Sequence, residues 1–431
     1  MNTEFRTSES AKARLDAARV ISAWLSQGLF PDRLLHRLAT QRSLAMELAY
    51  GVIRGWRALD WLRAQLAPRQ PRPELDALAL VGLQQLLFMD GMRDHAAVHE
   101  TVEAARAAEG PRAAGFVNAL LRRAQADRAN LLARLAEQPP GIRLSHPDIL
   151  LDRWTARYGV DAAARLCEWN NTPPAAALRP ARGAPADFPE RLRAAGIEVR
   201  PHPADPRFLE LPHGHRVEAL PGYAEGWFAV QDPSTAMAVD LLAPKPGERV
   251  LDACAAPGGK TILISERMER RGLLVAMDAS AGRLDRLREN LARFQDDFVR
   301  VAQGRADDPA LLEKGLPPDA RGGFDAILAD APCTNTGVLR RRPDARWRFN
   351  ADRLRGAVRQ QRALLDALAV TVAPGGRIVY STCSLEPEED EEQVRSWLKE
   401  HPGFSMEAER TLRPPGSKTD GAYAARLVRR G

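Results

Sequence analysis

The sequence predicts a multidomain protein, with an all-α bundle at the amino terminus, a small α+β subdomain after it, and a doubly wound α/β domain at the carboxyl end. Apolar residues recur at three- and four-residue spacing in the first third of the chain. Short, proline-rich segments of alternating polarity follow, and strand-like runs then alternate with helical ones. A chain of 431 residues has room for two or three domains. We place their boundaries at 1–140, 141–230 and 231–431.

The amino-terminal third shows helical periodicity in four long segments. Prolines and glycines such as Pro68, Pro73 and Gly110 separate these segments, as expected at helix boundaries. The run Gln-Pro-Pro-Gly at 138–141 predicts a linker, and two further helices are expected within 146–171. The four long helices are predicted at 11–25, 44–66, 75–89 and 116–135.

The remainder of the chain changes character twice. Short alternating segments within 175–225 predict a small mixed α+β subdomain. Beyond residue 231, apolar strand-like runs alternate with helices that begin near Lys260, Ser280, Asp352 and Pro387. Alternating βα units of this kind predict a parallel sheet with helices on both faces. Its strands are predicted at 249–254, 273–278, 298–302, 324–330 and 376–382.

Composition and charge exclude several classes of protein. Lysine and arginine number 62 against 56 acidic residues, a balance that permits a polyanionic partner without requiring one. The four cysteines form no C-x-x-C pair, so neither a disulfide framework nor a structural zinc site is expected. His213 and His215 lack partner ligands and fit a turn better than a metal site. With no apolar signal core at its start and no stretch of about eighteen apolar residues, we expect a soluble cytoplasmic protein.

A strand, a glycine-rich turn and the start of a helix follow one another within 250–261. Gly258 and Gly259 permit close approach of a ligand to the backbone, and free N–H groups at the helix start favour polar or anionic groups. The spacing is not that of a P-loop, because no glycine stands five positions before Gly259. The next predicted strand ends at Asp278, which could bind the ribose hydroxyls of a nucleoside cofactor or cap the helix that begins near Ser280.

Two cysteines directly follow predicted strands. Cys333 comes after the strand at 324–330, and Cys383 comes after the strand at 376–382. The carboxyl ends of strands in an open parallel sheet are where ligands and chemistry collect, so both thiols are candidates for covalent nucleophilic catalysis. Their position alone does not distinguish their roles. Cys167, on a predicted helix, is instead expected to pack in the core.

Three motifs at these positions resemble those of the S-adenosylmethionine-dependent RNA cytosine-5 methyltransferases. They are Asp-Ala-Cys-Ala-Ala-Pro-Gly-Gly-Lys-Thr at 252–261, Asp-Ala-Pro-Cys at 330–333, and Thr-Cys-Ser at 382–384 followed by Pro-Glu-Glu. Within that group, Thr-Gly-Val-Leu-Arg-Arg-Arg-Pro-Asp at 336–344 is similar to the bacterial 16S rRNA enzymes of the Fmu/Sun type. The resemblance implies that 231–431 form a Rossmann-like class I methyltransferase domain.

The resemblance also implies a role for each thiol. Cys383 is implied to be the nucleophile that adds to C6 of cytosine, and Cys333 to assist the elimination that frees the product. DNA cytosine methyltransferases place their nucleophile after a Pro-Cys pair, which taken alone would favour Cys333, but a second strand-end thiol has no role in that scheme. Asp330 is implied to contact both the base and the cofactor, S-adenosylmethionine. The other implied cofactor contacts are Cys254, which lines the site rather than reacting, Ala255, Ala256, Pro257, Gly258, Gly259, Lys260 and Asp278.

Basic side chains supply further candidates. Lys260 is expected near the cofactor or a substrate phosphate, with a solvated lysine at a helix start as the alternative. Arginines around Trp347 combine cations with a stacking surface, which is typical of RNA contact, although a solvated loop would have the same composition. The predicted RNA-binding residues are Arg340, Arg341, Arg342, Arg346 and Trp347.

Two positions depart from the family pattern. Arg305 stands where the family usually has an aspartate that binds the adenine side of the cofactor, although Asp307 and Asp308 follow closely. The segment Asp420-Gly421-Ala422-Tyr423 lacks one aromatic residue of the family's Asp-Gly-Phe-Phe pattern. Neither departure touches the thiols.

The predicted activity is methylation of a 16S rRNA cytosine at C5. The bundle at 1–140 resembles a NusB-like RNA-binding domain in the segments 98–105 and 115–122, which favours rRNA. A tRNA or another RNA is the alternative substrate, and a non-catalytic RNA-binding assembly or transcription factor is the alternative of another class. The intact thiols and cofactor loop argue against the latter. We expect a monomer whose partner is small-subunit rRNA, without a membrane or a metal.

Overall fold

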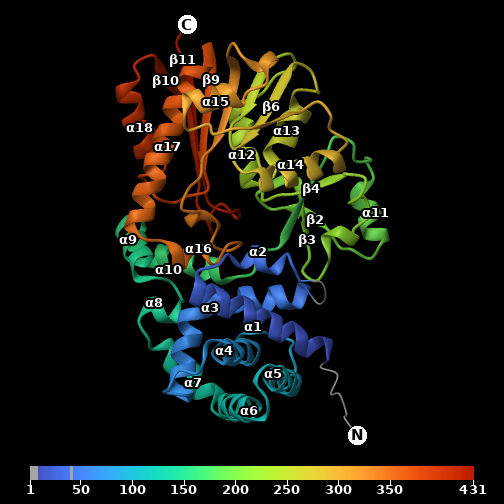
Figure 1. Ribbon diagram of the computed structural model, residues 1–431, viewed down its shortest axis with the longest axis vertical. Coiled ribbons are helices and arrows are strands. Elements are labelled where there is room, and N and C mark those ends of the chain that lie inside the picture. The colour runs from blue at the N-terminus through green and yellow to red at the C-terminus, as the bar shows by residue number, and fades with distance from the viewer. Residues whose placement is uncertain (1–7, 39–41) are drawn as a thin grey trace. The chain divides into compact units, whose positions relative to one another are not determined.

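The structure is a computed structural model that describes residues 8–38 and 42–431. It confirms the predicted fold class, a helical amino-terminal part followed by a small α+β sheet and a doubly wound α/β domain (Figure 1). Within the described residues, no helix is both long enough and apolar enough to cross a membrane.

Two compact units divide the chain, and their boundary is not sequential. One unit ends at Thr172 but also contains Arg342–Arg348. The other consists of Pro173–Arg341 and Phe349–Gly431. The short segment Arg342–Arg348 therefore lies far along the sequence from the helices with which it is packed.

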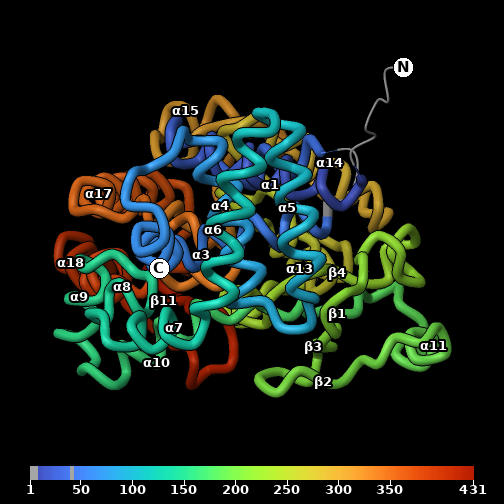
Figure 2. Tube along the Cα trace, turned by 90° about the horizontal axis from the view of Figure 1, so that it is seen from below, coloured from blue at the N-terminus to red at the C-terminus, as the bar shows by residue number. Residues whose placement is uncertain are grey.

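The helix α4 (Pro73–Phe88) is the centre of the helical unit. Four long helices pack around it: α1 (Glu9–Gln27), α3 (Arg42–Leu66), α5 (Asp94–Glu109) and α6 (Pro111–Ala126) (Figure 2). The side chains of α4 are accordingly buried on all sides between 76 and 87. Gly82 permits the closest approach, because a Cβ there would lie 2.6 Å from Cδ2 of Leu121 on α6. The buried Gln85 donates from its Nε2 to the hydroxyl of Thr101 and the carbonyl of Val81, while its Oε1 has no hydrogen-bond partner.

The helices predicted at 11–25, 44–66 and 75–89 are confirmed, whereas the single helix predicted over 116–135 is wrong. It is interrupted at Asp127, where φ −105° and ψ 17° are not helical. No helix was predicted for α5, whose buried side consists mainly of small residues with a weak hydrophobic signal. The shorter helices of this unit are α2 (Pro31–Leu35), α7 (Arg128–Ala136), α8 (Pro140–Arg143), α9 (Asp148–Tyr158), α10 (Val160–Asn171) and α16 (Ala345–Arg348).

The second unit is built on a seven-stranded sheet. In chain order its strands are β5 (Arg249–Asp252), β6 (Leu273–Asp278), β7 (Arg300–Gln303), β8 (Phe324–Asp330), β9 (Val372–Thr382), β10 (Phe404–Leu412) and β11 (Ala422–Arg429). In space they are ordered β10-β11-β9-β8-β5-β6-β7. Strands β5 to β9 pair in parallel, whereas β11 pairs antiparallel with both β9 and β10. The chain runs outward from β5 to β7 and then returns to β8 on the other side of β5. Ligands of such sheets bind outside the carboxyl ends of the strands where the order reverses.

Helices cover both faces of this sheet (Figure 1). Because side chains alternate along a strand, Val250 and Leu328 face one layer of helices while Leu251 and Ile327 face the other. The first layer contains α12 (Ser234–Leu242), α13 (Gly259–Arg267) and α14 (Ala281–Arg293). The second contains α15 (Pro309–Gly315), α17 (Ala351–Thr371) and α18 (Glu391–Glu400).

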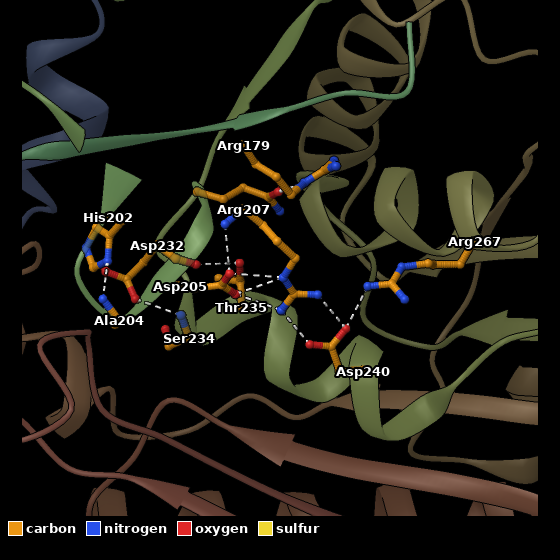
Figure 3. A network of polar contacts seen from close by, with 11 residues as sticks. Arg179, His202, Ala204, Asp205, Arg207, Asp232, Ser234, Thr235, Asp240 and Arg267 are labelled. Carbon is orange, nitrogen blue, oxygen red and sulfur yellow. Dashed lines mark hydrogen bonds and ion pairs between the residues drawn. The ribbon is translucent and has the colours of Figure 1, made fainter. Parts of the chain in front are cut away.

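The same unit holds a small four-stranded antiparallel sheet with the order β2-β3-β1-β4. Its elements are β1 (Ala176–Pro180), α11 (Phe188–Ala194), β2 (Arg200–His202), β3 (Asp205–Leu211) and β4 (Phe228–Val230). A polar network fixes it to the first helix layer: Arg207 of β3 contacts Asp240 of α12 at 2.7 Å, and Asp240 also accepts from Arg267 of α13 at 2.8 Å (Figure 3). Asp240 thus joins the small sheet to two helices of the large domain.

Candidate active site

The two strand-end cysteines are in contact. Parallel pairing sets Asp330 of β8 opposite Ser381 of β9, so the turns that follow the two strands leave the sheet side by side. The Sγ atoms of Cys333 and Cys383 lie 3.3 Å apart, and both side chains are half-buried. At that separation one thiol can donate a hydrogen bond to the other.

Asn335, which was not predicted from the sequence, contacts both cysteines. Its side-chain Nδ2 donates to the carbonyl of Cys333 at 3.0 Å, and its Oδ1 accepts from the thiol of Cys383 at 3.2 Å. The residue has a φ of 63°, in the left-handed region that asparagine tolerates better than most residues. A local preference for that conformation was the only signal available in the sequence.

Behind the thiols lies a buried carboxylate that was also not predicted as a site residue. Glu389 accepts hydrogen bonds from the backbone N–H of Thr334 at 2.9 Å and from the amide of Gln361 at 3.0 Å. The hydroxyls of Thr334 and Ser384 also donate to it. Burial raises the pKa of Glu389, while the hydrogen bonds from Ser384, Thr334 and Gln361 act in the opposite direction.

Cys333 is held in the protonated form. Its hydrogen bond to Cys383 is the largest cause that raises its pKa well above the ordinary range of a thiol, followed by burial and the negative charges of Cys383 and Glu389. Cys333 is therefore a thiol at neutral pH and can donate to the neighbouring sulfur.

An ion pair joins the cofactor loop to the strand that leads to Cys333. The Nζ of Lys260, in the first turn of α13, lies 2.7 Å from Oδ2 of Asp330, whose Oδ1 accepts from Ser381 at 3.1 Å. Burial by itself would lower the pKa of Lys260, but the charge and hydrogen bond of Asp330 outweigh it and raise that pKa. The charge of Cys383 also favours the Lys260 cation. Lys260 is therefore paired with Asp330 and is not a solvated lysine at the helix start.

The glycine-rich loop leaves no room for larger residues. Gly258 has a φ of 103°, and a Cβ there would lie 2.4 Å from Cδ1 of Leu287. Asp252, at the end of β5, accepts from the hydroxyl of Thr261 at 2.7 Å, while its Oδ1 is buried without a hydrogen-bond partner. Burial raises the pKa of Asp252 to about 7. The loop therefore presents an unsatisfied acidic group beside the free N–H groups of the first turn of α13.

Asp278 closes β6 on the other side of this loop. Its Oδ1 accepts from the backbone N–H of Ser280 at 3.0 Å, and its Oδ2 lies 3.1 Å from Arg283. Arg283 also donates to the carbonyl of Ala256 in the loop, at 2.9 Å. Cys254 is half-buried in the same loop, and burial raises its thiol pKa.

Several other residues singled out in the sequence have structural partners. Cys167 is fully buried, and burial raises its pKa to about 12. Arg305 is exposed and paired with Asp307 at 3.0 Å. Asp308 caps α15 by accepting from the N–H of Leu311. His213 and His215 are exposed at a turn, and the described residues contain no group of three or more metal-ligating side chains.

The arginine-rich segment contains two groups of predicted residues, first Arg340 to Arg342 and then Arg346 with Trp347. Arg341 contacts Asp420 at 2.6 Å and Asp232 at 2.8 Å, and Arg340 donates to the carbonyl of Pro173 at 3.1 Å. Arg342 is exposed. Asp420, from the segment that departs from the family's aromatic pattern, thus anchors the arginine run rather than lining a separate site.

The prediction of RNA contact is wrong for Arg346, and Trp347 is partly buried beside it. Arg346 is fully buried in the helical unit, where its guanidinium donates to carbonyl and amide oxygens. The Nε1 of Trp347 donates to the carbonyl of Ile53 at 2.7 Å, and its ring packs edge-on against Trp56 at 4.9 Å. The Arg346 guanidinium, which the sequence assigns to an RNA-binding surface, is instead used in packing, because a buried and an exposed arginine give the same signal in a sequence.

Comparisons with known proteins agree with this architecture. A model of the 16S rRNA methyltransferase RsmB/F family matches residues 239–428. A model of the NusB family matches 11–126, and one of the ferredoxin-like domain of RsmF/B-like methyltransferases matches 146–218. The three matches follow one another along the chain without overlap.

Individual relatives match over nearly the full length. Ribosomal RNA small subunit methyltransferase B of Pseudomonas putida is 37% identical over 441 residues, covering 96% of this chain and 98% of that protein. The protein of the same name from Vibrio cholerae is 38% identical over 396 residues, covering 89% of each. The crystal structure of PH0851 shares the fold, with a TM-score of 0.77 at 23% identity over 96% of this chain and 98% of that one. The sequence match over almost the whole length shows that the chain belongs to the RsmB/F family of 16S rRNA methyltransferases.

Proposed function

We propose that this protein transfers a methyl group from S-adenosylmethionine to C5 of a cytosine in 16S rRNA, through a covalent bond between Cys383 and C6 of the base. The observation that carries the proposal is the pair of thiols that follow two neighbouring strands and whose sulfurs are 3.3 Å apart. The relatives named as small-subunit rRNA methyltransferases support rRNA as the substrate.

The chemistry requires a nucleophilic thiolate. C5 of cytosine is too weak a nucleophile to take a methyl group unaided, but addition of the Cys383 thiolate to C6 gives C5 the character of an enamine carbon. Once C5 carries the methyl group, transfer of its proton to a water molecule and departure of the Cys383 sulfur as a thiolate restore the aromatic base. Cys333 lies against that sulfur as a thiol and assists the departure by donating a hydrogen bond to it.

Lys260 and Asp330 supply charge on the cofactor side of the thiols. We assign to the Asp330 carboxylate a hydrogen bond from the exocyclic amine of cytosine, because it keeps free lone pairs beyond those used by Lys260 and Ser381. The charges of Asp330 and Cys383 both favour the Lys260 cation. The pair therefore orients the base and supports the thiolate.

The residues of the glycine-rich loop fit S-adenosylmethionine, which supplies an electrophilic methyl group when bound. Asp252 keeps a buried carboxyl oxygen without a partner, and a donor on the cofactor would satisfy it. The first-turn N–H groups of α13 suit a carboxylate, and Asp278 at the end of β6 suits ribose hydroxyls. We assign the cofactor to this loop, with Cys254, Ala255, Ala256, Pro257, Gly258 and Gly259 as its lining.

A labelling experiment tests the proposal. The protein is incubated with tritiated S-adenosylmethionine and unmodified 16S rRNA, and a tRNA preparation serves as the comparison substrate. Label should enter 16S rRNA as 5-methylcytosine, Cys383→Ala should abolish it, and Cys333→Ala should accumulate a denaturation-resistant protein–RNA adduct. Absence of transfer to any RNA would contradict the enzymatic assignment, transfer to tRNA alone would change the substrate, and an adduct with Cys383→Ala instead would exchange the roles of the thiols.

A further inference from the structure

A single buried carboxylate contacts the residue that follows each of the two thiols. Glu389 lies just before α18 and is fully buried. Thr334, directly after Cys333, donates to it through both its N–H and its hydroxyl. Ser384, directly after Cys383, donates through its hydroxyl. The two turns that carry the thiols are thus held to one another through one side chain.

We propose that Glu389 is a positioning residue that makes the two thiols unequal, by fixing the turn after Cys333 to the turn after Cys383 and by keeping a negative charge behind Cys333. The inference rests on the proposed function and adds to it the residue that decides which thiol is the nucleophile. Glu389 itself touches neither the substrate nor the reacting sulfur in this assignment.

The carboxylate is rigidly held. Tyr380, fully buried on β9, donates to the backbone carbonyl of Glu389 at 2.6 Å, so the main chain at this residue is anchored to the strand that ends before Cys383. The amide of Gln361 on α17 donates to the side chain at 3.0 Å. Glu389 therefore meets four side-chain and backbone donors, which suits an ionised carboxylate, since that group accepts hydrogen bonds and donates none.

The charges around the thiols are asymmetric. The Glu389 carboxylate adds to the hydrogen bond and burial that raise the pKa of Cys333, and so favours its protonated form. The Lys260 cation interacts with Cys383 instead, and it is itself paired with Asp330. Glu389 also makes two hydrogen bonds to the turn after Cys333 and one to the turn after Cys383, so its contacts favour the Cys333 side. Two further titratable groups of this region are engaged internally, the carboxylate of Asp390 by the hydroxyl of Thr382 and the hydroxyl of Tyr380 by the carbonyl of Glu389.

Two substitutions separate the effect of the negative charge of Glu389 from the effect of its side-chain length. Glu389→Gln removes the charge and keeps the length, and its amide can still accept from the N–H of Thr334 while the two hydroxyls rotate to accept from its nitrogen. Glu389→Asp keeps the charge but withdraws it by one methylene, which breaks the link between the turns. Glu392→Gln, at an exposed position three residues further on, removes the same charge from the surface and serves as the control.

The measurement is alkylation of the full-length protein by iodoacetamide without RNA, between pH 6 and 10, with each cysteine followed by mass spectrometry. In the wild type and in Glu392→Gln, Cys383 should be alkylated faster than Cys333 at every pH. In Glu389→Gln, Cys333 alkylation at pH 8 should rise by about three- to tenfold, the effect of a thiol pKa lower by roughly half to one unit. In Glu389→Asp, Cys333 should stay slow, while kcat for methyl transfer falls and KM for RNA is retained.

The following results would overturn the role proposed for Glu389. An unchanged ratio of Cys333 to Cys383 alkylation in folded Glu389→Gln, judged by circular dichroism and melting temperature, would overturn the inference. If Glu389→Gln does not fold, fast Cys333 alkylation in Glu389→Asp, in which the charge remains, would overturn it equally. Failure of the wild type to methylate RNA contradicts the proposed function alone, because alkylation of the two thiols is read without substrate.

Discussion

Replacing Arg346 by methionine should destabilise the helical unit rather than weaken RNA binding. The guanidinium donates to four acceptors, at 2.7 Å to Oδ1 of Asn171 and at 3.0–3.2 Å to the carbonyls of Ser145, Asn170 and Arg54. Nη1 shares its two protons among three of these acceptors, so the guanidinium makes about three full hydrogen bonds. At about 1.5–3 kcal/mol each, their sum is roughly 4.5–9 kcal/mol. Burial lowers the pKa of Arg346, which means that the cation carries a desolvation cost that methionine would not. That cost is several kcal/mol, and the expected net loss is about 3–5 kcal/mol.

Hydrogen exchange of the full-length protein measures this loss within the helical unit. A single unfolding midpoint would not, because a protein of several domains does not unfold in one step. Amides of α3, α9 and α10 should exchange faster in Arg346→Met by a factor that corresponds to the lost free energy, about 100-fold or more. Arg342→Met, at an exposed position four residues earlier, should leave exchange unchanged. If Arg346→Met leaves exchange as it is in the wild type and weakens RNA binding, the packing role is refuted.

Three further predictions concern the second unit. Burial raises the pKa of Asp252 to about 7, above its value in the unfolded chain, so the stability of the cofactor-free second unit should fall as the pH rises from about 4 to about 7; hydrogen exchange of the β5 amides, corrected for the intrinsic pH dependence of exchange, should show this slope, and Asp252→Asn should reduce it, whereas parallel slopes would contradict the assignment. Mild oxidation with diamide should join Cys333 to Cys383, whose sulfurs are 3.3 Å apart, with loss of activity that dithiothreitol restores; peptide mapping that finds no such link would count against the contact. In Gly337→Ala, a Cβ would lie 2.6 Å from the carbonyl oxygen of Gly421 and 2.8 Å from that of Cys383, so single-turnover methyl transfer should slow by about 10- to 100-fold, and an unchanged rate would show that the turn adapts.

The parts of the fold and site that follow from local sequence could be predicted. Strand ends in a parallel sheet meet at one edge, so the positions of Asp278, Cys333 and Cys383 after apolar runs were enough to bring the candidate groups to that edge. Three of the long helices of the bundle could also be predicted locally, because the apolar residues of a helix repeat at a fixed spacing within the segment itself.

The remainder depends on contacts between distant segments. Glu389 and Asn335 act on the thiols through turns that only the folded sheet brings together, and Arg283 reaches the cofactor loop from α14. Nothing in their local pattern distinguishes them from a solvated acid, a turn asparagine or a surface arginine. Arg346 misled the prediction in the opposite direction: a charged residue in a basic run reads as surface, and only its carbonyl partners from α3, α10 and the residue before His146 show that it is interior.

The assignment of Arg342–Arg348 to the helical unit bears on how the protein is made. Domains generally fold as units during synthesis, with the amino-terminal one first. Here the amino-terminal unit lacks part of its interior until the ribosome has translated most of the chain, since the guanidinium of Arg346 and the indole of Trp347 both come from beyond the second unit's strand β8. The nascent bundle must therefore wait for a late segment, and its maturation ends after much of the sheet that follows it has already been synthesised.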